Sequence, residues 1–553
     1  MKNLLIILLL SFGTLQAQEK QYNFAHPLKI PISLNASFGE LRNNHFHSGI
    51  DYATQQAEGK NVYSIDDGYV ARIAVSPVGF GRALYIAHPK TGLTSVYGHL
   101  QGFTAEIDSI VKNYQYENRQ SQVDFQLDEK QIPVKRDQLI GKSGNSGSSG
   151  GPHLHFEVRD TKSEEIINPL HFGFGIEDTR KPTIRAIAVY PVEGVVNGRT
   201  SRLTVETIPE LGATRFKTPT AITAWGKIGL AVKAYDAIDN SIKTLGVNEI
   251  RLFVDEQLVS MYKINRFAFD ESRFINSFID FDDWKRHRSF FMKSFVEPNN
   301  QLRLFKIGAE RGYINISEER DYKIHYEVFD TYGNKASLAF VIRGKKAAVP
   351  SKPECEEKLL YNQQNIVQKA DFKAVMPQNV LYDDLCLDYK RTPSKTYLSD
   401  IHYLQDSYTP LHDYIDISLP YDAHKIADTS KLLAIKTNGT QHPIVLGGTW
   451  ENGQMNFKTR EFGAFAVMID TIPPKITPQP KAPLRFKISD NLSGIDTYNG
   501  YIDGVWALFE YDAKTRSLFH RPDRRVRLLK PYKLRLEVTD KVGNKAVYEN
   551  TVR

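Results

Sequence analysis

The stretch that most constrains the fold of this chain is residues 150–158, with the sequence GGPHLHFEV. From His153 onward, polar and apolar side chains alternate. Because successive side chains of a β-strand point to opposite faces, a strand here places His153, His155 and Glu157 on one face and an apolar anchor on the other. The preceding run, residues 141–149, is rich in Gly and Ser and is typical of a loop. These features predict a sheet with an open face on which two imidazoles can meet one ion or substrate.

The length and composition indicate several ordinary globular domains. The chain has 553 residues, of which 41% are hydrophobic and 24% charged, and a single hydrophobic core rarely extends beyond about 250–300 residues. The formal net charge of +7 is dispersed along the chain, without a cluster of Lys and Arg interleaved with aromatic residues. We therefore expect three or four domains and no binding to nucleic acid.

The first residues are typical of an export signal. Lys2 precedes a short apolar run, residues 4–10, and residues 15–17 (LQA) fit the small-residue pattern of a cleavage site. The apolar run is far shorter than the ~20 residues of a membrane span, and no second run of spanning length follows it. The sequence therefore predicts a signal peptide over residues 1–17 that is cleaved near Ala17. It also predicts a periplasmic or secreted protein with no transmembrane segment after cleavage.

Residues 22–175 predict an antiparallel sheet of short strands and hold eight of the 15 histidines. The β-rich runs end at Gly, Asp or Pro; they are residues 61–65, 68–75, 83–88, 93–97 and 153–158. Residues 101–132 interrupt this pattern of short β-rich runs. They predict an insertion at the sheet edge, with a short helix near residues 107–114 and a strand near residues 123–127. A lid or substrate-gripping role and a mere packing role are equally open for this insertion.

From residue 178 the chain changes character and repeats itself. Similar segments begin at Asp178 and Asp470, and the unit Asp-x-x-Gly-Asn recurs at residues 330–334 and 540–544. Gly-Asn tolerates the positive φ of a hairpin turn, and an alternating strand precedes each unit. The two repeats resemble the β-sandwich, immunoglobulin-like modules at the tails of exported bacterial proteins. They span residues 178–345, with an aromatic and charged insert around 267–295, and residues 470–553.

Two further segments complete the organisation of the chain. Residues 346–354 have the composition of a linker, and residues 355–469 predict another β-rich module without the spacing of a chemical site. Cys355 and Cys386 are the two cysteines of the sequence. In an exported chain one disulfide between them and two free thiols are about equally open, whereas a cysteine-rich zinc site is excluded by count.

The residues that complete a metal site with the histidine strand lie upstream, in residues 45–51 (HFHSGID). His47 and Asp51 are four residues apart, which places both on one face of a strand or of a helical turn. With one imidazole from the strand they give three nitrogen or oxygen ligands and leave a fourth position open for water, as in catalytic zinc sites. His45 is the alternative to His47, but its spacing to the Gly and Asp fits less well.

A third motif, residues 96–100 (VYGHL), ends a predicted strand and contributes His99. Once three ligands are assigned, His99 and one of His153 or His155 are left over. A metal hydrolase needs such residues to accept a proton from the water or to stabilise the oxyanion. Glu157 shares the histidine face, and we take it as a partner of the site rather than a ligand. Spacing alone does not choose between His153 and His155.

These segments resemble the signature motifs of the M23 (lysostaphin/LytM-type) zinc metallopeptidases. The resemblance rests on HSGID at residues 47–51, YGHL at 97–100 and GPHLHFEV at 151–158, together with GYV at 68–70, GFG at 79–81 and IGKSGNSG at 140–147. It covers roughly residues 28–172. The long segment 101–132 departs from the family pattern, in which it is usually much shorter, and this leaves substrate preference and access to the site open.

By position, the resemblance implies one zinc ion bound by His47, Asp51 and His155, with His99 and His153 as the catalytic histidines. It also implies a fold: a mainly β protein in which an antiparallel-sheet catalytic domain precedes the β-sandwich modules. The substrates of the family are peptide cross-bridges and stems of peptidoglycan. The chain is therefore expected to be an exported zinc metalloendopeptidase that acts on peptidoglycan peptides.

Two other classes of function remain alongside this expectation. Some proteins with this domain have lost their ligands and act as non-hydrolytic LytM-type binding modules that activate or recruit other cell-wall hydrolases. Because all five residues are present in this chain, the sequence favours the enzyme. The C-terminal β modules could also make the chain mainly an adhesion or scaffold protein, with proteins of the cell envelope as partners.

Overall fold

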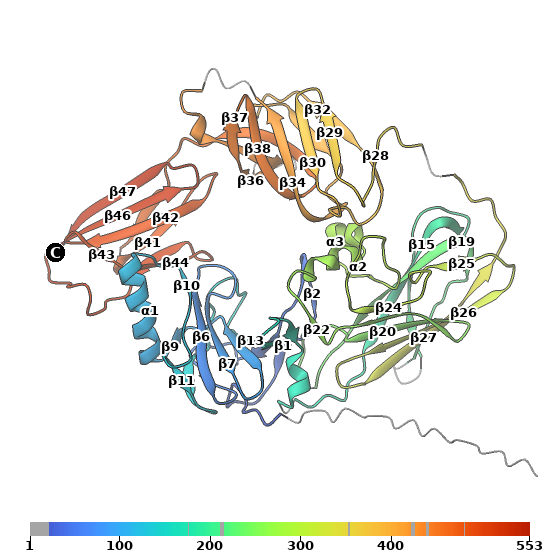
Figure 1. Ribbon diagram of the computed structural model, residues 1–553, viewed down its shortest axis with the longest axis horizontal. Helices are drawn as coiled ribbons and strands as arrows, with labels where there is room; N and C mark the ends of the chain where they lie inside the picture. Colours follow the sequence, from blue (N-terminus) through green and yellow to red (C-terminus); the bar gives the residue numbers. More distant parts are fainter. Residues whose placement is uncertain are drawn as a thin grey trace, which may run out of the picture.

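The computed structural model of the protein describes residues 22–174, 176–210, 215–239, 241–351, 354–421, 426–437, 439, 442–480 and 482–553. The predicted signal peptide, residues 1–17, lies outside the described residues. As predicted, the described chain is mainly β, and its sheets are largely antiparallel. Figure 1 shows four parts arranged around a ring, so that the last part returns to helix α1 (Ala105–Asn118) of the first. No described helix is both long and apolar enough to cross a membrane.

The first part, residues 22–174, is built on a sheet with the strand order β1-β4-β13-β8-β7-β6-β10. These strands are β1 (Leu34–Ala36), β4 (Ile50–Ala53), β6 (Gly68–Val75), β7 (Arg82–His88), β8 (Leu93–Gly98), β10 (Val123–Gln126) and β13 (His153–Asp160). A small second sheet contains β5 (Asn61–Tyr63), β12 (Leu139–Lys142) and β9 (Gly102–Phe103), and a hairpin joins β2 (Leu41–Arg42) to β3 (His45–Phe46). All five strands predicted for this part are present, with small shifts at their ends.

The predicted alternation of side chains along β13 is confirmed. The polar face of the strand, however, is exposed to solvent at one end only. Leu154, Phe156 and Val158 are fully buried in the core. Glu157 and Arg159, on the histidine face, are buried as well, because Arg159 packs over the rings of Tyr85 and Phe269. On this face only His153, at the start of the strand, is partly exposed. Access to the histidines is therefore confined to one end of the strand.

The insertion forms a longer helix than predicted. Helix α1 spans Ala105–Asn118, 14 residues, instead of the short segment predicted near residues 107–114. Two acidic residues in its first turn, Glu106 and Asp108, interact favourably with the helix dipole. Ile107 and Val111 pack into the core of the first part, and β10 follows as the predicted edge strand, antiparallel to β6.

The second part, residues 176–351, shares its core with the first. Its strands are joined in a 12-stranded sheet with the main order β16-β15-β19-β27-β26-β20-β21-β24. These strands are β15 (Thr183–Val196), β16 (Leu203–Glu206), β19 (Ile222–Tyr235), β20 (Glu249–Val254), β21 (Gln257–Lys263), β24 (Phe305–Ile307), β26 (Asp321–Phe329) and β27 (Lys335–Gly344). Although the sequence indicates a boundary near residue 178, one hydrophobic cluster contains side chains from both parts. A ladder between β14 (Ile166–Ile167) and β22 (Arg266–Phe267) also crosses this boundary.

The aromatic and charged insert predicted around residues 267–295 supports the hairpin that leads to His47. It contains β22 and the short helices η2 (Ser272–Phe274), α2 (Ile275–Phe278) and α3 (Phe281–His287). The Phe267 ring lies 5.3 Å from the ring of Phe38 and 5.6 Å from that of Phe46. The backbone N–H of Phe46 donates to Ser272 Oγ at 2.8 Å. The residue next to His47 is thus held by the second part.

The remaining two parts each pair two sheets. The middle module contains the sheet β29-β30-β34-β38-β37 and the sheet β32-β33-β39-β35-β36. The strands of the first sheet are β29 (Asn365–Lys369), β30 (Phe372–Met376), β34 (Pro410–Pro420), β37 (Thr449–Glu451) and β38 (Gln454–Glu461). Those of the second are β32 (Tyr389–Thr392), β33 (Ile401–Leu404), β35 (Leu432–Thr437), β36 (Ile444–Gly447) and β39 (Gly463–Ile469). The last module contains the sheets β40-β41-β45-β44 and β43-β42-β46-β47. Its strands are β40 (Lys475–Gln479), β41 (Ala482–Ser489), β42 (Ile495–Ile502), β43 (Val505–Ala507), β44 (Phe509–Asp512), β45 (Ser517–His520), β46 (Tyr532–Asp540) and β47 (Lys545–Val552).

Both predicted hairpin turns are confirmed. The Asp-x-x-Gly-Asn units join β26 to β27 and β46 to β47, which pair antiparallel. Gly333 has a φ of 91° and Gly543 a φ of 80°, values that favour glycine. The structure also settles the state of the cysteines, since Cys355 and Cys386 form a disulfide within the middle module.

The shared core predicts that a change in the second part weakens the first. Phe267 is fully buried between Phe38 and Phe46, so Phe267→Ala should cost about 3–5 kcal/mol of the free energy of unfolding. Urea unfolding followed by tryptophan fluorescence measures this loss. Leu258→Ala, at a side chain that is 44% exposed in the same part, is the control and should be nearly neutral. Equal effects of the two substitutions would contradict a shared core.

Candidate metal centre

The register of three strands places the predicted residues around one point. β13 lies between β4 and β8, and His155 is directly opposite Asp51 on β4 and Gly98 on β8. His99 follows Gly98 at the end of β8, and His47 precedes β4 in the chain. A side chain on Gly98 would lie 3.3 Å from the Cβ of His155, so the glycine leaves room for this imidazole. The strand pairing therefore brings together residues that lie about 100 positions apart.

Three ligand atoms form a compact triangle. His47 Nε2 lies 3.1 Å from Asp51 Oδ1 and 3.2 Å from His155 Nδ1. The Asp51 Oδ1 to His155 Nδ1 distance is 2.9 Å. Ligands about 2.0–2.1 Å from a tetrahedral zinc ion are separated by roughly 3.3–3.4 Å, close to these edges. All three side chains are buried, so the triangle has the size and the seclusion of a metal site.

The outer nitrogens of the two imidazoles are committed to oxygen acceptors. His47 Nδ1 lies 2.7 Å from the carbonyl oxygen of Ser37, and His155 Nε2 lies 3.0 Å from Glu157 Oε1. Because these oxygens only accept, each nitrogen must carry the proton and donate it. The inner nitrogens, His47 Nε2 and His155 Nδ1, are then left with lone pairs that face Asp51. This is the usual arrangement of metal-binding histidines.

The charge of the triangle also fits a cation. Burial would lower the pKa of His155, but its hydrogen bonds to Asp51 and Glu157 outweigh burial and raise it to about 9. Burial opposes ionisation of Asp51 too, yet His47 and His155 hold its pKa well below the usual range. In the metal-free chain His155 therefore carries a second proton, on Nδ1. This proton lies where the lone pairs of His47 Nε2, Asp51 Oδ1 and His155 Nδ1 would otherwise meet. A metal ion displaces such a proton when it binds.

Glu157 connects the triangle to a buried ion pair. Its carboxylate is fully buried and accepts from Arg159 Nε at 2.7 Å. Burial alone would raise the pKa of Glu157, but the charge of Arg159 and the bond to His155 lower it to about 2. The carboxylate therefore stays ionised and fixes both the orientation and the tautomer of His155. Glu157 is a partner of a ligand, as taken from the sequence, and not part of the triangle.

His99 and His153 lie beside the triangle, and in both rings Nδ1 carries the proton. His99 Nδ1 donates to the carbonyl oxygen of Ser146 at 2.9 Å, and His153 Nδ1 donates to that of Gly151 at 2.8 Å. Their ring centroids are 4.7 Å apart, and His153 Nε2 lies 3.5 Å from Asp51 Oδ1. Burial, aided by His155 and His153, lowers the pKa of His99 to about 3, and burial lowers that of His153. Both rings are therefore neutral near pH 7, with Nε2 unprotonated.

The Gly/Ser-rich segment before β13, residues 143–151 (called here the Gly/Ser loop), holds these two histidines through its backbone. Ser146 and Gly151, which accept their protons, both belong to this loop. The loop packs closely on residues 79–81: a Cβ on Gly147 would lie 2.3 Å from the backbone nitrogen of Gly81, so only glycine fits there. The ring of Phe80 stacks on His155 with centroids 4.8 Å apart. The loop was predicted to allow access to the histidines; in the structure it also holds the rings of His99 and His153 in place.

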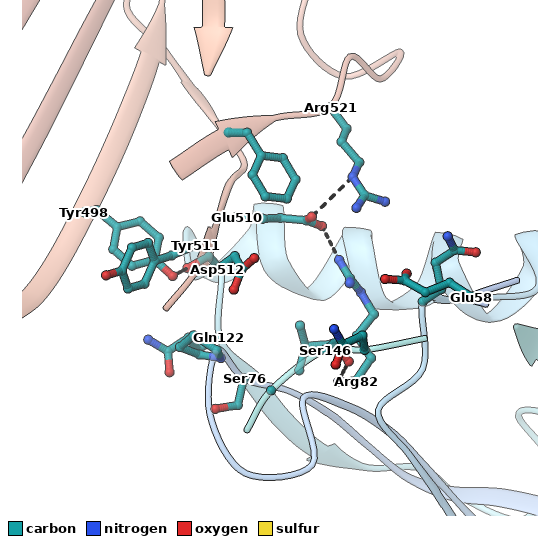
Figure 2. A pocket seen from close by; sticks show the side chains of 17 residues that line it. Glu58, Ser76, Arg82, Gln122, Ser146, Tyr498, Glu510, Tyr511, Asp512 and Arg521 are labelled. Carbon is teal, nitrogen blue, oxygen red and sulfur yellow. Dashed lines mark hydrogen bonds and ion pairs between the residues drawn. The ribbon is translucent and has the colours of Figure 1, made fainter. Parts of the chain in front are cut away.

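The last module closes on this loop. Lys514, in the turn between β44 and β45, donates to the carbonyl oxygens of Asn145 and Ser149. Figure 2 shows Glu510 of the last module between Arg82 of β7 and Arg521, and the Arg82 Nη2 to Glu510 Oε1 distance is 2.6 Å. A cavity of about 200 Å³ lies at this interface, and Ser146 and Tyr498 are among the residues that line it.

The insertion carries the rest of this interface. Tyr116 of α1 donates to Asp523 at 3.0 Å and packs edge-on against Trp506. Ser121, which follows the helix, donates to the Tyr498 hydroxyl at 2.9 Å. The insertion therefore serves as a docking platform for the last module, a role that differs from both a lid and a local packing element.

The structure brings together all five residues singled out from the sequence. The alternative ligand His45 is exposed, and its Nδ1 bonds to the carbonyl of Asn43, away from the triangle. Sequence reasoning missed the carbonyls of Ser37, Ser146 and Gly151, because a backbone acceptor has no signature in side-chain patterns. It also missed Lys514, which is separated from Asn145 by 369 positions.

Known proteins that are similar to part of this chain include peptidases. Over 124 residues the chain is 32% identical to an uncharacterized metalloprotease of Haemophilus influenzae, a match that covers 22% of this chain and 20% of that protein. Over a segment of the same length it is 31% identical to the DD-carboxypeptidase/endopeptidase Mpg of Neisseria meningitidis, covering 22% of each. The chain thus spans about a fifth of the length of these curated relatives.

A solved structure and a family model extend the comparison. The catalytic domain of the prophage-encoded M23 protein EnpA of Enterococcus faecalis is 25% identical, with a TM-score of 0.20, and the match covers 27% of this chain and 98% of that domain. The model of the Zu5-like domain matches residues 356–470, which form the middle module. The names of the curated relatives confirm the resemblance of this chain to metallopeptidases. The immunoglobulin-like character of the other modules stays a prediction.

The Glu157 contact yields a test of the metal site that is independent of catalysis. Glu157→Gln removes the charge that orients His155 and places an amide N–H₂ against Arg159, so zinc affinity should fall about 10–100-fold. Glu164→Gln is the matched control, because Glu164 Oε2 also pairs with Arg159, at 3.2 Å, but on an exposed side chain. Competition with a chromogenic chelator measures both affinities. Unchanged zinc binding in Glu157→Gln would contradict the proposed role of this carboxylate.

Proposed function

Taking the first part as an M23-type metallopeptidase domain, we propose that the chain is an exported zinc metalloendopeptidase that hydrolyses peptide bonds in peptidoglycan cross-bridges or stems. The observation that carries the proposal is the convergence of His47 Nε2, Asp51 Oδ1 and His155 Nδ1. Two nitrogens and one carboxylate oxygen are the ligand set of a catalytic zinc site with an open position.

The zinc ion would supply a Lewis acid that polarises a peptide carbonyl and makes a water molecule nucleophilic near neutral pH. The protein supplies the proton chemistry. His99 and His153 present unprotonated Nε2 atoms beside the triangle, and burial, which lowers the pKa of both imidazoles, favours their neutral form. Either ring can accept a proton at Nε2 and then, as a cation, donate a hydrogen bond to the oxyanion of the substrate. The carbonyls of Ser146 and Gly151 keep both rings in the tautomer that this requires.

Two further observations support the substrate and the location. The relative from Neisseria meningitidis is named a DD-carboxypeptidase/endopeptidase, an activity directed at peptide bonds. The export signal predicted over residues 1–17 would deliver the chain to the compartment that contains peptidoglycan.

Substitutions should separate the residues that hold zinc from those that move protons. His47→Ala and Asp51→Ala should lose both bound zinc and hydrolysis. His99→Ala and His153→Ala should keep zinc but lose about 10²–10⁴-fold in turnover. His45→Ala is the control, because this exposed imidazole points away from the site, and should keep both properties. Metal analysis of the purified variants and hydrolysis assays distinguish these outcomes, and hydrolysis by zinc-free Asp51→Ala would contradict the mechanism.

Digestion of purified peptidoglycan, with mass analysis of the fragments, tests the reaction itself. New amino termini within stem or cross-bridge peptides should appear with the wild-type chain and be absent with His47→Ala. Soluble fragments that appear only when another wall hydrolase is present would instead support a non-hydrolytic activator.

The contact of Lys514 with the Gly/Ser loop predicts that the last module tunes catalysis. Lys514→Ala should lower turnover about fivefold, the equivalent of ~1 kcal/mol in the activation barrier, without changing zinc affinity. Lys487→Ala, at an exposed lysine of β41 in the same module, is the control and should leave turnover unchanged. The same turnover in both variants would show that Lys514 does not position the loop.

A further inference from the structure

Three aspartates meet where the second part of the chain begins. Asp178 is the first residue of the predicted module, Asp236 follows β19, and Asp330 begins the turn between β26 and β27. One carboxylate oxygen of each lies within 4.8 Å of the others. The ion pairs of this module involve other carboxylates, such as those of Glu327 and Asp321. Among the described residues, no Lys, Arg or His forms an ion pair with the three aspartates.

The Asp236 carboxylate accepts a hydrogen bond from the backbone N–H of Ala237, but only one of its two oxygens is satisfied. The residue is only 8% exposed, and its Oδ1 atom has no hydrogen-bond partner. Burial, together with the charges of Asp330 and Asp178, raises the pKa of Asp236 to about 8. A buried carboxylate beside two others is strongly unfavourable unless a cation or a proton neutralises it.

The last module repeats the arrangement with Asp470, Asp490 and Asp540, whose ligand oxygens also lie within 4.8 Å of one another. As in the second part, these residues are the first of the module, the one after an early strand, and the first of the Asp-x-x-Gly-Asn unit. Asp490 Oδ1 has no hydrogen-bond partner, nor does the hydroxyl of Ser493, a side chain only 3% exposed whose N–H donates to Asp470. Asp490 is less buried than Asp236, and its Oδ2 accepts from the backbone of Leu492 and Gly494. Three close aspartates with one unpartnered carboxylate oxygen thus occur in two separate modules.

Both clusters lie at a seam with the preceding part of the chain. In the second part, the turn that begins with Asp330 contains Thr331, whose hydroxyl oxygen accepts from Asn168 Nδ2 of the first part at 3.3 Å. In the last module, Lys431 of the middle module donates to the Val542 carbonyl of the corresponding turn at 2.7 Å. A ligand shared by the three aspartates would join the entry of each module to its last hairpin, next to this seam.

We propose that each aspartate cluster binds one divalent cation of the Ca²⁺ type, which ties the module together at its junction with the preceding part. The clusters consist of carboxylates without His or Cys, the ligand class that Ca²⁺ prefers and zinc does not. Two oxygens on opposite sides of a Ca²⁺ ion lie about 4.8 Å apart, since Ca²⁺–O distances are about 2.4 Å. Mg²⁺ requires a tighter octahedron and retains more of its water. These sites are distinct from the zinc site and do not rest on the proposed peptidase activity.

Calcium titration of the zinc-loaded full chain by calorimetry tests the proposal. The wild type should bind two Ca²⁺ ions, and its melting temperature should rise by several degrees at saturation. Asp236→Asn and Asp490→Asn should each bind one ion, and the double variant none. Asp321→Asn, at an exposed carboxylate of the second part paired with Arg343, is the control and should bind two. His47→Ala should also bind two, which separates these sites from the zinc site.

The Asn variants remain informative if stability changes, because Asn is nearly isosteric with Asp and removes charge repulsion. In calcium-free buffer they should be at least as stable as the wild type. The proposal is overturned if the wild type binds no Ca²⁺ up to ~10 mM, above the range of weak extracellular sites. It is equally overturned if the variants bind like the wild type, or if their gain in stability is the same with and without Ca²⁺, since protons would then neutralise the clusters.

Discussion

The hydrogen bonds made by the outer nitrogens of four histidines are the constraint on which the site depends. The Glu157 carboxylate, on the same strand, decides which nitrogen of His155 carries the proton. The backbone carbonyls of Ser146, Gly151 and Ser37 do the same for His99, His153 and His47. Each inner nitrogen therefore keeps its lone pair. Without these acceptors the rings could rotate or change tautomer. The ligand atoms of His47, Asp51 and His155 would then share a proton instead of binding a metal ion.

The fold supplies these acceptors from widely separated segments. The pairing of β13 with β4 and β8 sets the positions of the ligands, while the second part supports the hairpin before His47 and shares its core with the first. The last module, docked on the insertion, holds the Gly/Ser loop. The arrangement of the four parts in Figure 1 therefore bears on the site, because Lys514 of the last part contacts the loop that orients His99 and His153.

Much of this site could be predicted from the sequence, for reasons that differ between residues. The alternation along residues 153–158 defines a strand and a common face, because side-chain direction in a strand follows position alone. The choice of His155 over His153 came from family resemblance, since it depends on Glu157 and on the carbonyl of Gly151. The buried polar face of β13 and the docking of the last module were not predictable, because they arise from contacts between distant segments. Helix α1 proved longer than predicted, as helix ends are poorly determined by local patterns.

The central claim is that His47, Asp51 and His155 form a zinc site with one open position. X-ray absorption spectroscopy at the zinc edge of the zinc-loaded protein tests it most directly. We predict one zinc ion per chain with about four nitrogen or oxygen ligands at ~2.0–2.1 Å, multiple-scattering features of two imidazoles, and no sulfur. Scattering from four imidazoles, or a shell of six oxygens without imidazole, would contradict the account.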